Sequence, residues 1–258
     1  MKHPHGTFCW MDIYLPDPER GKTFYNGMFG WEWTDVPMGE TGMSYTMFNL
    51  EGKTVGAMGP SMPGMFPEGV PPVWFSYIAT DDIEATAEVA RSLGATFRMG
   101  PAEVGNGKVA LLEEPGGGAA FFLWQALEFG GAEVKNTPGA LVWNELYTRD
   151  LGATQRFYSG LFGWEWSSMP MLQGGEYHLA NVGEMPIAGA LVMDENWGEI
   201  PPHWMVYIQV ANADEAAARV ESLGGDVCVP VTEIAVGRFA VVNDDQKGTF
   251  TIFEPKAH

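Results

Sequence analysis

The amino-acid sequence predicts an α+β protein built from four βαβββ units, two in each half of the chain. Two observations carry this prediction. The pentapeptide Phe-Gly-Trp-Glu-Trp occurs at 29–33 and again at 162–166, and Phe-Tyr precedes both copies at the same distance. Within each half, the hydrophobic pattern runs strand, helix and three strands, and then repeats that order. A tandem duplication explains both observations.

The repeat extends beyond the pentapeptide and divides the chain. Pro-Pro-Val-Trp at 71–74 corresponds to Pro-Pro-His-Trp at 201–204. A segment near 129–138, with Gly-Gly, charges and Asn-Thr-Pro-Gly, separates the two copies. We therefore expect two homologous domains, residues 1–130 and 131–258, each large enough for a core of its own.

The first half shows how each element is predicted. Residues 8–15 read as a strand, and a helix follows it, capped by Asp17, begun by Pro18 and ended before Gly30. Segments separated by glycine-containing turns predict the next three strands, at 31–36, 43–50 and 54–58. The second unit has a strand, a helix after Asp81 or Asp82, and three more strands, at 73–79, 81–93, 95–99, 108–112 and 120–124. The second half repeats this order, with helices near 150–161 and 212–223.

Composition and charge narrow the class of protein. The chain is 46% hydrophobic and 18% charged, without an apolar run long enough for a membrane helix. A net charge of −19 opposes binding to nucleic-acid phosphates and anionic membranes. The N-terminus lacks the apolar core of a signal peptide, so we expect a cytoplasmic protein. Cys9 and Cys228 are not equivalent in the repeat, and we expect both to be small buried hydrophobes.

Three motifs carry a family resemblance. The first is a strand followed by Asp-x6-Phe-Tyr and Phe-Gly-Trp, which starts at Asp17 and again at Asp150. The others are Tyr-Ile-Ala-Thr-Asp-Asp-Ile-Glu-Ala at 77–85 and the closing turns at 114–117 and 244–247. In these motifs the chain resembles the vicinal oxygen chelate superfamily, which includes glyoxalase I, bleomycin-resistance proteins and extradiol dioxygenases. The resemblance covers nearly the whole chain and implies two glyoxalase-like open-barrel domains in tandem. The chain is similar in particular to a two-domain subgroup of this superfamily whose members are named glyoxalase-like or hydroxylase.

The resemblance also implies three metal-ligand positions in each cup-shaped domain. In this sequence they fall on aromatic or weakly coordinating residues: Trp10, Phe75 and about Phe122 in the first half, and Trp143, Met205 and about Thr251 in the second. Indole, phenyl and thioether groups do not bind hard divalent cations. We therefore expect neither the superfamily's usual metal site nor another cofactor.

Aromatic side chains at the ligand positions predict a concave site for a flat or apolar organic molecule. The predicted ligand-binding residues are those with an aromatic, thioether or matched tyrosine side chain: Trp10, Trp143, Phe75, Met205, Phe122, Tyr45 and Tyr177. The alternative is that these side chains fill the cups as core. Pro- and Gly-rich loops at 60–72 and 194–202 are candidate lids.

Two carboxylates are candidate catalytic groups. Asp12 and Glu145 lie two residues after Trp10 and Trp143, so strand alternation places each carboxylate on the face of its tryptophan. A carboxylate in such a cup would have a raised pKa and could act as a general acid or base. Alternatively, each carboxylate serves structure by accepting a hydrogen bond from a tyrosine or a backbone amide.

Histidine allows one noncanonical divalent metal site, in the second half alone, from His178, His203 and Glu145. Strand parity does not show whether these three groups converge.

Three functions are compatible with the sequence. One is a small-molecule binding protein of the bleomycin-resistance type. Another is an enzyme, either a glyoxalase-like lyase or isomerase or a hydroxylase-like oxidoreductase, which uses Asp12 or Glu145 or a noncanonical metal. A non-catalytic structural or signalling module is the third. We expect a small-molecule ligand, no nucleic-acid or membrane partner, and a monomer or homodimer.

Overall fold

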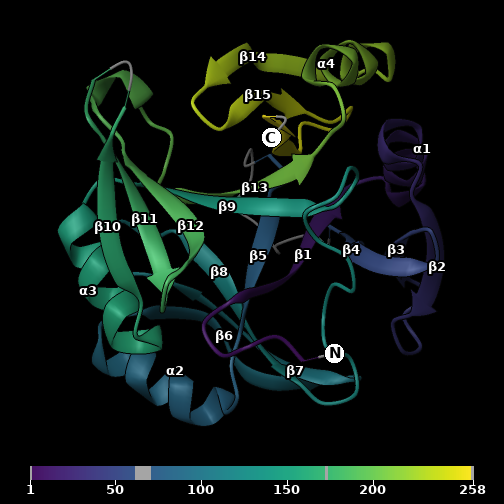
Figure 1. Cartoon of the computed structure of the whole chain (residues 1–258). Helices are drawn as coiled ribbons and strands as arrows, with labels where there is room; N and C mark the ends of the chain where they lie inside the picture. Colours follow the sequence, from purple (N-terminus) through teal and green to yellow (C-terminus); the bar gives the residue numbers. More distant parts are fainter. Residues whose placement is uncertain (1, 62–70, 172–173, 257–258) are drawn as a thin grey trace. The chain divides into compact units, whose positions relative to one another are not determined.

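A computed structural model describes residues 2–61, 71–171 and 174–256. Its elements repeat in the order strand, helix and three strands, four times along the described chain (Figure 1). In the first half they are β1 (Phe8–Leu15), α1 (Pro18–Phe29), β2 (Glu32–Pro37), β3 (Ser44–Leu50), β4 (Lys53–Pro60), β5 (Trp74–Ala79), α2 (Ile83–Ser92), β6 (Thr96–Val104), β7 (Gly107–Glu113) and β8 (Ala120–Ala126).

The second half repeats the series and adds one 3-10 helix, η1 (Glu195–Trp197), within the predicted loop at 194–202. Its other elements are β9 (Leu141–Thr148), α3 (Leu151–Phe162), β10 (Glu165–Pro170), β11 (Glu176–Val182), β12 (Met185–Val192), β13 (His203–Gln209), α4 (Ala213–Ser222), β14 (Asp226–Ile234), β15 (Gly237–Asn243) and β16 (Thr249–Pro255). Most of the predicted loop at 60–72 lies outside the described residues.

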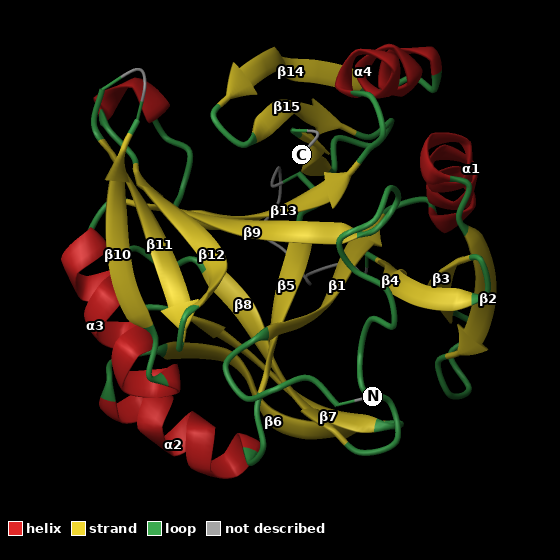
Figure 2. Cartoon of the chain, in the orientation of Figure 1, coloured by secondary structure: helices red, strands yellow, loops and turns green. Residues whose placement is uncertain are grey.

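The strands of each half form one eight-stranded mixed sheet (Figure 2). The strand order is β2-β3-β4-β1-β5-β8-β7-β6 in the first half and β10-β11-β12-β9-β13-β16-β15-β14 in the second. The two orders are the same when the elements are counted from the start of each half. The predicted α+β fold with four βαβββ units is therefore confirmed.

Contacts between residues group the chain into two compact units that combine parts of both halves. Unit 1 comprises residues 1–10, 75–131 and 143–205, and unit 2 comprises 11–74, 132–142 and 206–258. In unit 1, α2 contacts α3, and the two helices lie side by side in Figure 1. In unit 2, α1 contacts α4. The expected domains, 1–130 and 131–258, stay a prediction.

The repeated Phe-Gly-Trp-Glu-Trp motif completes the core of each unit. In unit 2, Trp31 is fully buried, stacks on Tyr25 at 5.6 Å and donates from Nε1 to the carbonyl oxygen of Gly139 at 2.7 Å. In unit 1, Trp164 stacks on Tyr158 at 4.7 Å and donates to the carbonyl oxygen of Gly6 at 2.8 Å. Each motif therefore bonds to the segment that precedes the first strand of the other half.

Helix ends follow the predicted sequence signals. The Asp17 side chain accepts from the backbone amide of Arg20, and Asp150 accepts from that of Ala153. Both helices end at a glycine in the left-handed region, Gly30 at φ 70° and Gly163 at φ 70°. The Phe-Gly of the repeated motif thus ends the helix, and its first tryptophan enters the core.

Two further sequence predictions can be compared with the fold. No helix in the described ranges is long and apolar enough to cross a membrane. Cys9 is buried, as expected, but Cys228 is exposed on β14, so the prediction for Cys228 is wrong. β14 is the last strand in its sheet, and all of its side chains are exposed or half-buried.

Candidate functional site

The middle of β9 presents three side chains to one face of its sheet. Trp143, Glu145 and Tyr147 alternate along the strand, so they share a face. The intervening Leu146 points the other way into the core of unit 1. Glu145 and Tyr147 are buried, whereas Trp143 is only half-buried.

A hydrogen-bond chain connects Trp143 to Glu145 through Tyr177. The Trp143 indole donates from Nε1 to the Tyr177 hydroxyl at 2.9 Å. That hydroxyl donates in turn to Oε2 of Glu145 at 2.6 Å. All three residues belong to unit 1, and the sequence singled out each of them. The predicted tyrosine partner of Glu145 is confirmed.

The geometry of this chain requires a glycine that sequence analysis missed. Tyr177 lies on β11, and β12 separates β11 from β9 in the sheet. Gly189 of β12 pairs with Glu145, and a Cβ added there would lie 1.8 Å from the Tyr177 hydroxyl oxygen and 3.1 Å from Trp143 Nε1. Tyr177 therefore reaches across β12 over a position without a side chain. A glycine within a strand is the signal that could have indicated this approach.

Electrostatics keep the Tyr177 hydroxyl protonated. Burial, together with the Glu145 carboxylate, raises the pKa of Tyr177 far above its ordinary value of 10.0. A protonated phenol beside a carboxylate acts as donor to it, which agrees with the 2.6 Å contact. The chain therefore has a fixed direction, from indole to phenol to carboxylate.

The first half has a related but shorter arrangement, in unit 2. The Tyr45 hydroxyl donates to Oδ2 of the fully buried Asp12 at 2.7 Å, so the predicted tyrosine partner is confirmed there too. Ala57 pairs with Asp12 and occupies the position that Gly189 has in the second half.

Trp10, Phe75 and Phe122 belong to a closed aromatic cluster in unit 1. Phe122 stacks on Tyr77 at 4.4 Å and meets Phe75 at 5.3 Å. Trp10 is 3% exposed and packs edge-on against Phe129 at 4.9 Å. Neighbouring side chains therefore cover these predicted ligand-binding residues, which agrees with the core alternative for the first half.

The residues at the superfamily's metal-ligand positions do not fit a divalent cation. Strand pairing places Phe122 beside Tyr77 and Thr251 beside Tyr207, so Phe122 and Thr251 are equivalent. The side chains at the six positions are two indoles, two phenyl rings, a thioether and one hydroxyl. Among the described residues, no three His, Cys, Asp or Glu side chains gather as metal ligands would.

The structure does not bring together the three residues of the possible noncanonical metal site, His178, His203 and Glu145. Tyr177 points to Glu145, and His178, the next residue of the extended β11, therefore faces the other side of the sheet. His203 starts β13, the strand beside β9, and Met205 follows it on the same face.

Two further carboxylates, those of Glu114 and Asp244, are buried. From the sequence they were identified only as residues of the two closing turns. In unit 2, Oδ2 of Asp244 accepts from the Tyr25 hydroxyl at 2.8 Å, and Trp74 donates to that hydroxyl at 3.1 Å. In unit 1, Oε2 of Glu114 accepts from the backbone amide of Gly116 at 2.6 Å, while Oε1 is buried and has no partner among the described residues. Burial raises the pKa of Glu114 and of Asp244.

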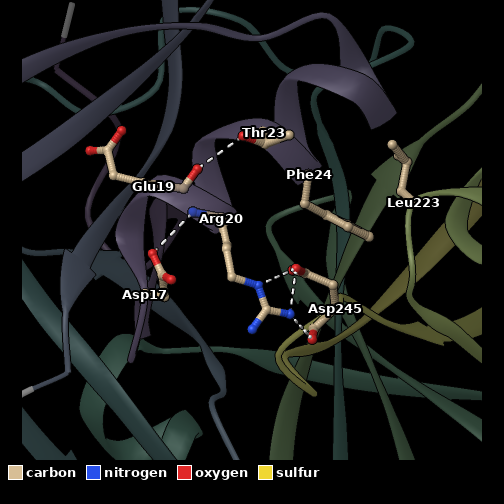
Figure 3. A pocket seen from close by; sticks show the side chains of 7 residues that line it. All are labelled: Asp17, Glu19, Arg20, Thr23, Phe24, Leu223 and Asp245. Carbon is tan, nitrogen blue, oxygen red and sulfur yellow. Dashed lines mark hydrogen bonds and ion pairs between the residues drawn. The ribbon is translucent and has the colours of Figure 1, made fainter.

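A hollow of about 280 Å³ lies in unit 2 at the start of α1 (Figure 3). Phe24 and Leu223 line it, together with a set of charged and polar residues: Asp17, Glu19, Arg20, Thr23 and Asp245. Its polar groups bond one another, since Arg20 donates from Nε to Oδ2 of Asp245 at 2.9 Å and Asp17 caps the helix. None of the predicted site residues lines this hollow.

The fold and the strand order define an α+β protein with tandem βαβββ units in two mixed sheets. The model of the Glyoxalase/Bleomycin resistance protein/Dioxygenase superfamily matches residues 7–122. CFP32 of Mycobacterium tuberculosis, which carries a provisional glyoxylase name, is 36% identical over 256 residues, covering 98% of this chain and 97% of CFP32. The chain therefore belongs to this superfamily.

A second relative is named for a different role, and two solved structures have a similar fold. The anthracycline biosynthesis protein DnrV of Streptomyces peucetius is 33% identical over 260 residues, covering 96% of this chain and 93% of DnrV. Among solved structures, a Mn(II)-bound glyoxalase from Novosphingobium aromaticivorans has a TM-score of 0.65 at 15% identity, covering 97% of this chain and 82% of that one. The 2,3-dioxygenase LapB from Pseudomonas sp. KL28 has a TM-score of 0.68 at 12% identity, with 98% and 94% covered. These two structures share the fold.

Proposed function

We propose that the protein binds a flat aromatic or apolar organic molecule on the second-half face that carries Trp143, Tyr177 and Glu145. One observation carries the proposal: Trp143 and Tyr177 are half-buried and joined to a buried carboxylate, whereas Trp10, equivalent to Trp143, is covered. A half-buried indole offers a stacking surface, and its hydrogen bond to the Tyr177 hydroxyl fixes its orientation.

The relative DnrV supports the chemical class of the ligand. Its name places it in anthracycline biosynthesis, a chemistry of fused aromatic rings. The net charge of −19 supports a small-molecule ligand over nucleic acid or an anionic membrane. The proposal includes a cytoplasmic protein that needs no divalent metal to bind its ligand.

Calorimetric titration with 2-methoxynaphthalene tests the proposal, because this probe is flat and has no hydrogen-bond donor. We expect binding that Trp143→Ala weakens by about tenfold or more, since an aromatic contact and its buried area are lost. Trp10→Phe is the matched control and should bind like the wild type. Equal affinities for the wild type and Trp143→Ala would refute the proposed site.

A second candidate function is acid–base catalysis at the same face. The 2.6 Å contact between Tyr177 and Glu145 favours it, because a phenol held by a carboxylate can relay a proton. The glyoxylase name of CFP32 suggests the hemithioacetal of methylglyoxal and a thiol as the test substrate. Catalysis by this pair predicts that Glu145→Gln and Tyr177→Phe each lower turnover at least about a hundredfold, while Asp12→Asn does not. Unchanged turnover in both second-half variants would exclude it.

A further inference from the structure

Three aromatic rings form a cluster beside the proposed binding face. Tyr147 of β9 lies 4.8 Å from the Trp197 ring and 5.0 Å from the His203 ring, the latter at an interplanar angle of 31°. Trp197 and His203 are themselves 6.5 Å apart. The cluster belongs to unit 1 and unites β9, η1 and the start of β13.

Arg149, the residue after β9, holds the loop that carries Trp197. Arg149 donates from Nη2 to the carbonyl oxygens of Gly198 at 2.7 Å and Ile200 at 3.0 Å. The side chain of Asp194 begins η1 by accepting from the backbone amide of Asn196 at 3.0 Å. Trp197 therefore has a defined place against Tyr147 and His203.

The neighbours of His203 determine which of its nitrogens carries the proton. Nδ1 lies 2.8 Å from the carbonyl oxygen of Pro201, and a carbonyl oxygen only accepts, so Nδ1 is the donor. Burial lowers the pKa of His203 below its ordinary value of 6.5, which favours the neutral ring at neutral pH. In a neutral imidazole whose Nδ1 is protonated, Nε2 has a lone pair. No residue in the described ranges bonds Nε2.

His203 lies on the same face as the proposed site. β13 and β9 are neighbours in the sheet, and Tyr147, which packs against His203, shares the face of Trp143 and Glu145. The first half lacks an equivalent acceptor, because Val73 occupies the corresponding position in the repeat. A neutral acceptor on the sheet face of Trp143 is therefore specific to the second half.

We propose that Nε2 of His203 accepts a hydrogen bond from the bound molecule, so that the ligand is an aromatic ring carrying a hydroxyl or N–H donor. This inference rests on the proposed function, because it adds a polar contact to the aromatic site at Trp143. Tyr147 and Trp197 orient the imidazole, and the Pro201 carbonyl fixes the tautomer that accepts. A ligand with the same rings but no donor binds the same face without this contact.

A matched pair of probes separates the polar contact from aromatic stacking. The full-length protein is titrated calorimetrically at neutral pH with 2-naphthol, which has a donor, and with 2-methoxynaphthalene, which does not. We expect the wild type to bind 2-naphthol about tenfold more tightly, the usual effect of one hydrogen bond. His203→Phe keeps a ring against Tyr147 and should abolish this preference, so that the two probes bind with about equal affinity. His203→Gln, whose carbonyl oxygen can accept, should restore part of the preference.

The outcomes distinguish this inference from the proposed function. A tenfold preference that persists in His203→Phe, or that is absent from the wild type, overturns the role of His203. In either case, binding of 2-methoxynaphthalene that depends on Trp143 still upholds the proposed function. If 2-methoxynaphthalene binds equally well to Trp143→Ala, the proposed function fails and this inference fails with it. Circular dichroism of both His203 variants checks that they fold.

Discussion

The indole of Trp164 donates a hydrogen bond to the carbonyl oxygen of Gly6, 158 residues earlier in the chain. Trp31 makes the reciprocal bond to Gly139. The two tryptophans are fully or almost fully buried, at 0% exposure for Trp31 and 1% for Trp164. Each thus satisfies a polar group of the other half within an apolar core.

Replacement of either tryptophan should destabilise the protein strongly. Trp164→Phe removes the donor to Gly6 and leaves a small cavity, so we expect a loss of about 2–4 kcal/mol in the free energy of unfolding. Trp31→Phe should have a similar effect on unit 2. Urea denaturation measures both. Trp33→Phe, at a side chain 43% exposed, is the control and should change stability by less than about 0.5 kcal/mol.

Gly189→Ala should disrupt the Trp143–Tyr177–Glu145 chain. The new methyl carbon would lie 1.8 Å from the Tyr177 hydroxyl oxygen, so Tyr177 must move away. We expect a loss of about 1–3 kcal/mol in stability, typical of overpacking, and weaker binding of 2-methoxynaphthalene. A double-mutant cycle with Tyr177→Phe should show coupling, because removal of the hydroxyl relieves part of the clash. Additive effects would contradict this geometry.

The Asp12–Tyr45 and Glu145–Tyr177 pairs should contribute about equally to stability, but only the Glu145–Tyr177 pair should affect ligand binding. Tyr45→Phe and Tyr177→Phe each remove a donor from a buried carboxylate, at 2.7 Å and 2.6 Å, so both should cost about 1–3 kcal/mol of stability. Only Tyr177→Phe should weaken probe binding, because Trp143 also depends on that hydroxyl. Equal effects on binding would assign ligand contact to both halves.

Glu114 should make stability depend on pH in a direction opposite to that of a usual carboxylate. Burial raises the pKa of Glu114 above its ordinary value of 4.5, so the folded state binds the proton more tightly than the unfolded chain does. This contribution to stability is complete below the unfolded pKa and is lost as pH rises through the folded pKa. Glu114→Gln should therefore gain stability relative to the wild type as pH rises above about 4.5.

Glu133 provides a control of opposite sign in urea titrations extended below about pH 4.5, where its carboxyl titrates. Hydrogen bonds from the backbone amide of Thr54 at 2.9 Å and from its hydroxyl at 3.1 Å lower the pKa of Glu133. Its contribution is present above the unfolded pKa and is lost as pH falls through the folded pKa. Glu133→Gln should therefore lose stability relative to the wild type as pH rises. Parallel pH profiles for the two variants would refute this assignment.

The fold could be predicted because duplication supplies two independent copies of each signal. Asp17 and Asp150 cap equivalent helices, and the parity of Asp12 and Glu145 identified the faces on which Tyr45 and Tyr177 meet them. Local spacing determines these features, so one strand or one helix is enough to derive them.

What could not be predicted depends on which strands lie next to one another. The role of Gly189 requires the order β11-β12-β9, and that of His203 requires the cluster with Tyr147 and Trp197. The exposure of Cys228 follows from the edge position of β14. In each case, the decisive neighbour is distant in sequence, and hydrophobic periodicity carries no information about it.

The exchange of hydrogen bonds between the halves has a consequence for how the duplicated gene can change. Because each compact unit is assembled from both copies, deletion of either copy would leave two unfinished cores instead of one intact domain. The buried tryptophans that complete the two cores, Trp31 and Trp164, are the same residue in both copies. The equivalent half-buried positions 73 and 203 have diverged, to valine in one copy and histidine in the other. The two copies thus share the tryptophans that complete their cores and differ at positions outside them.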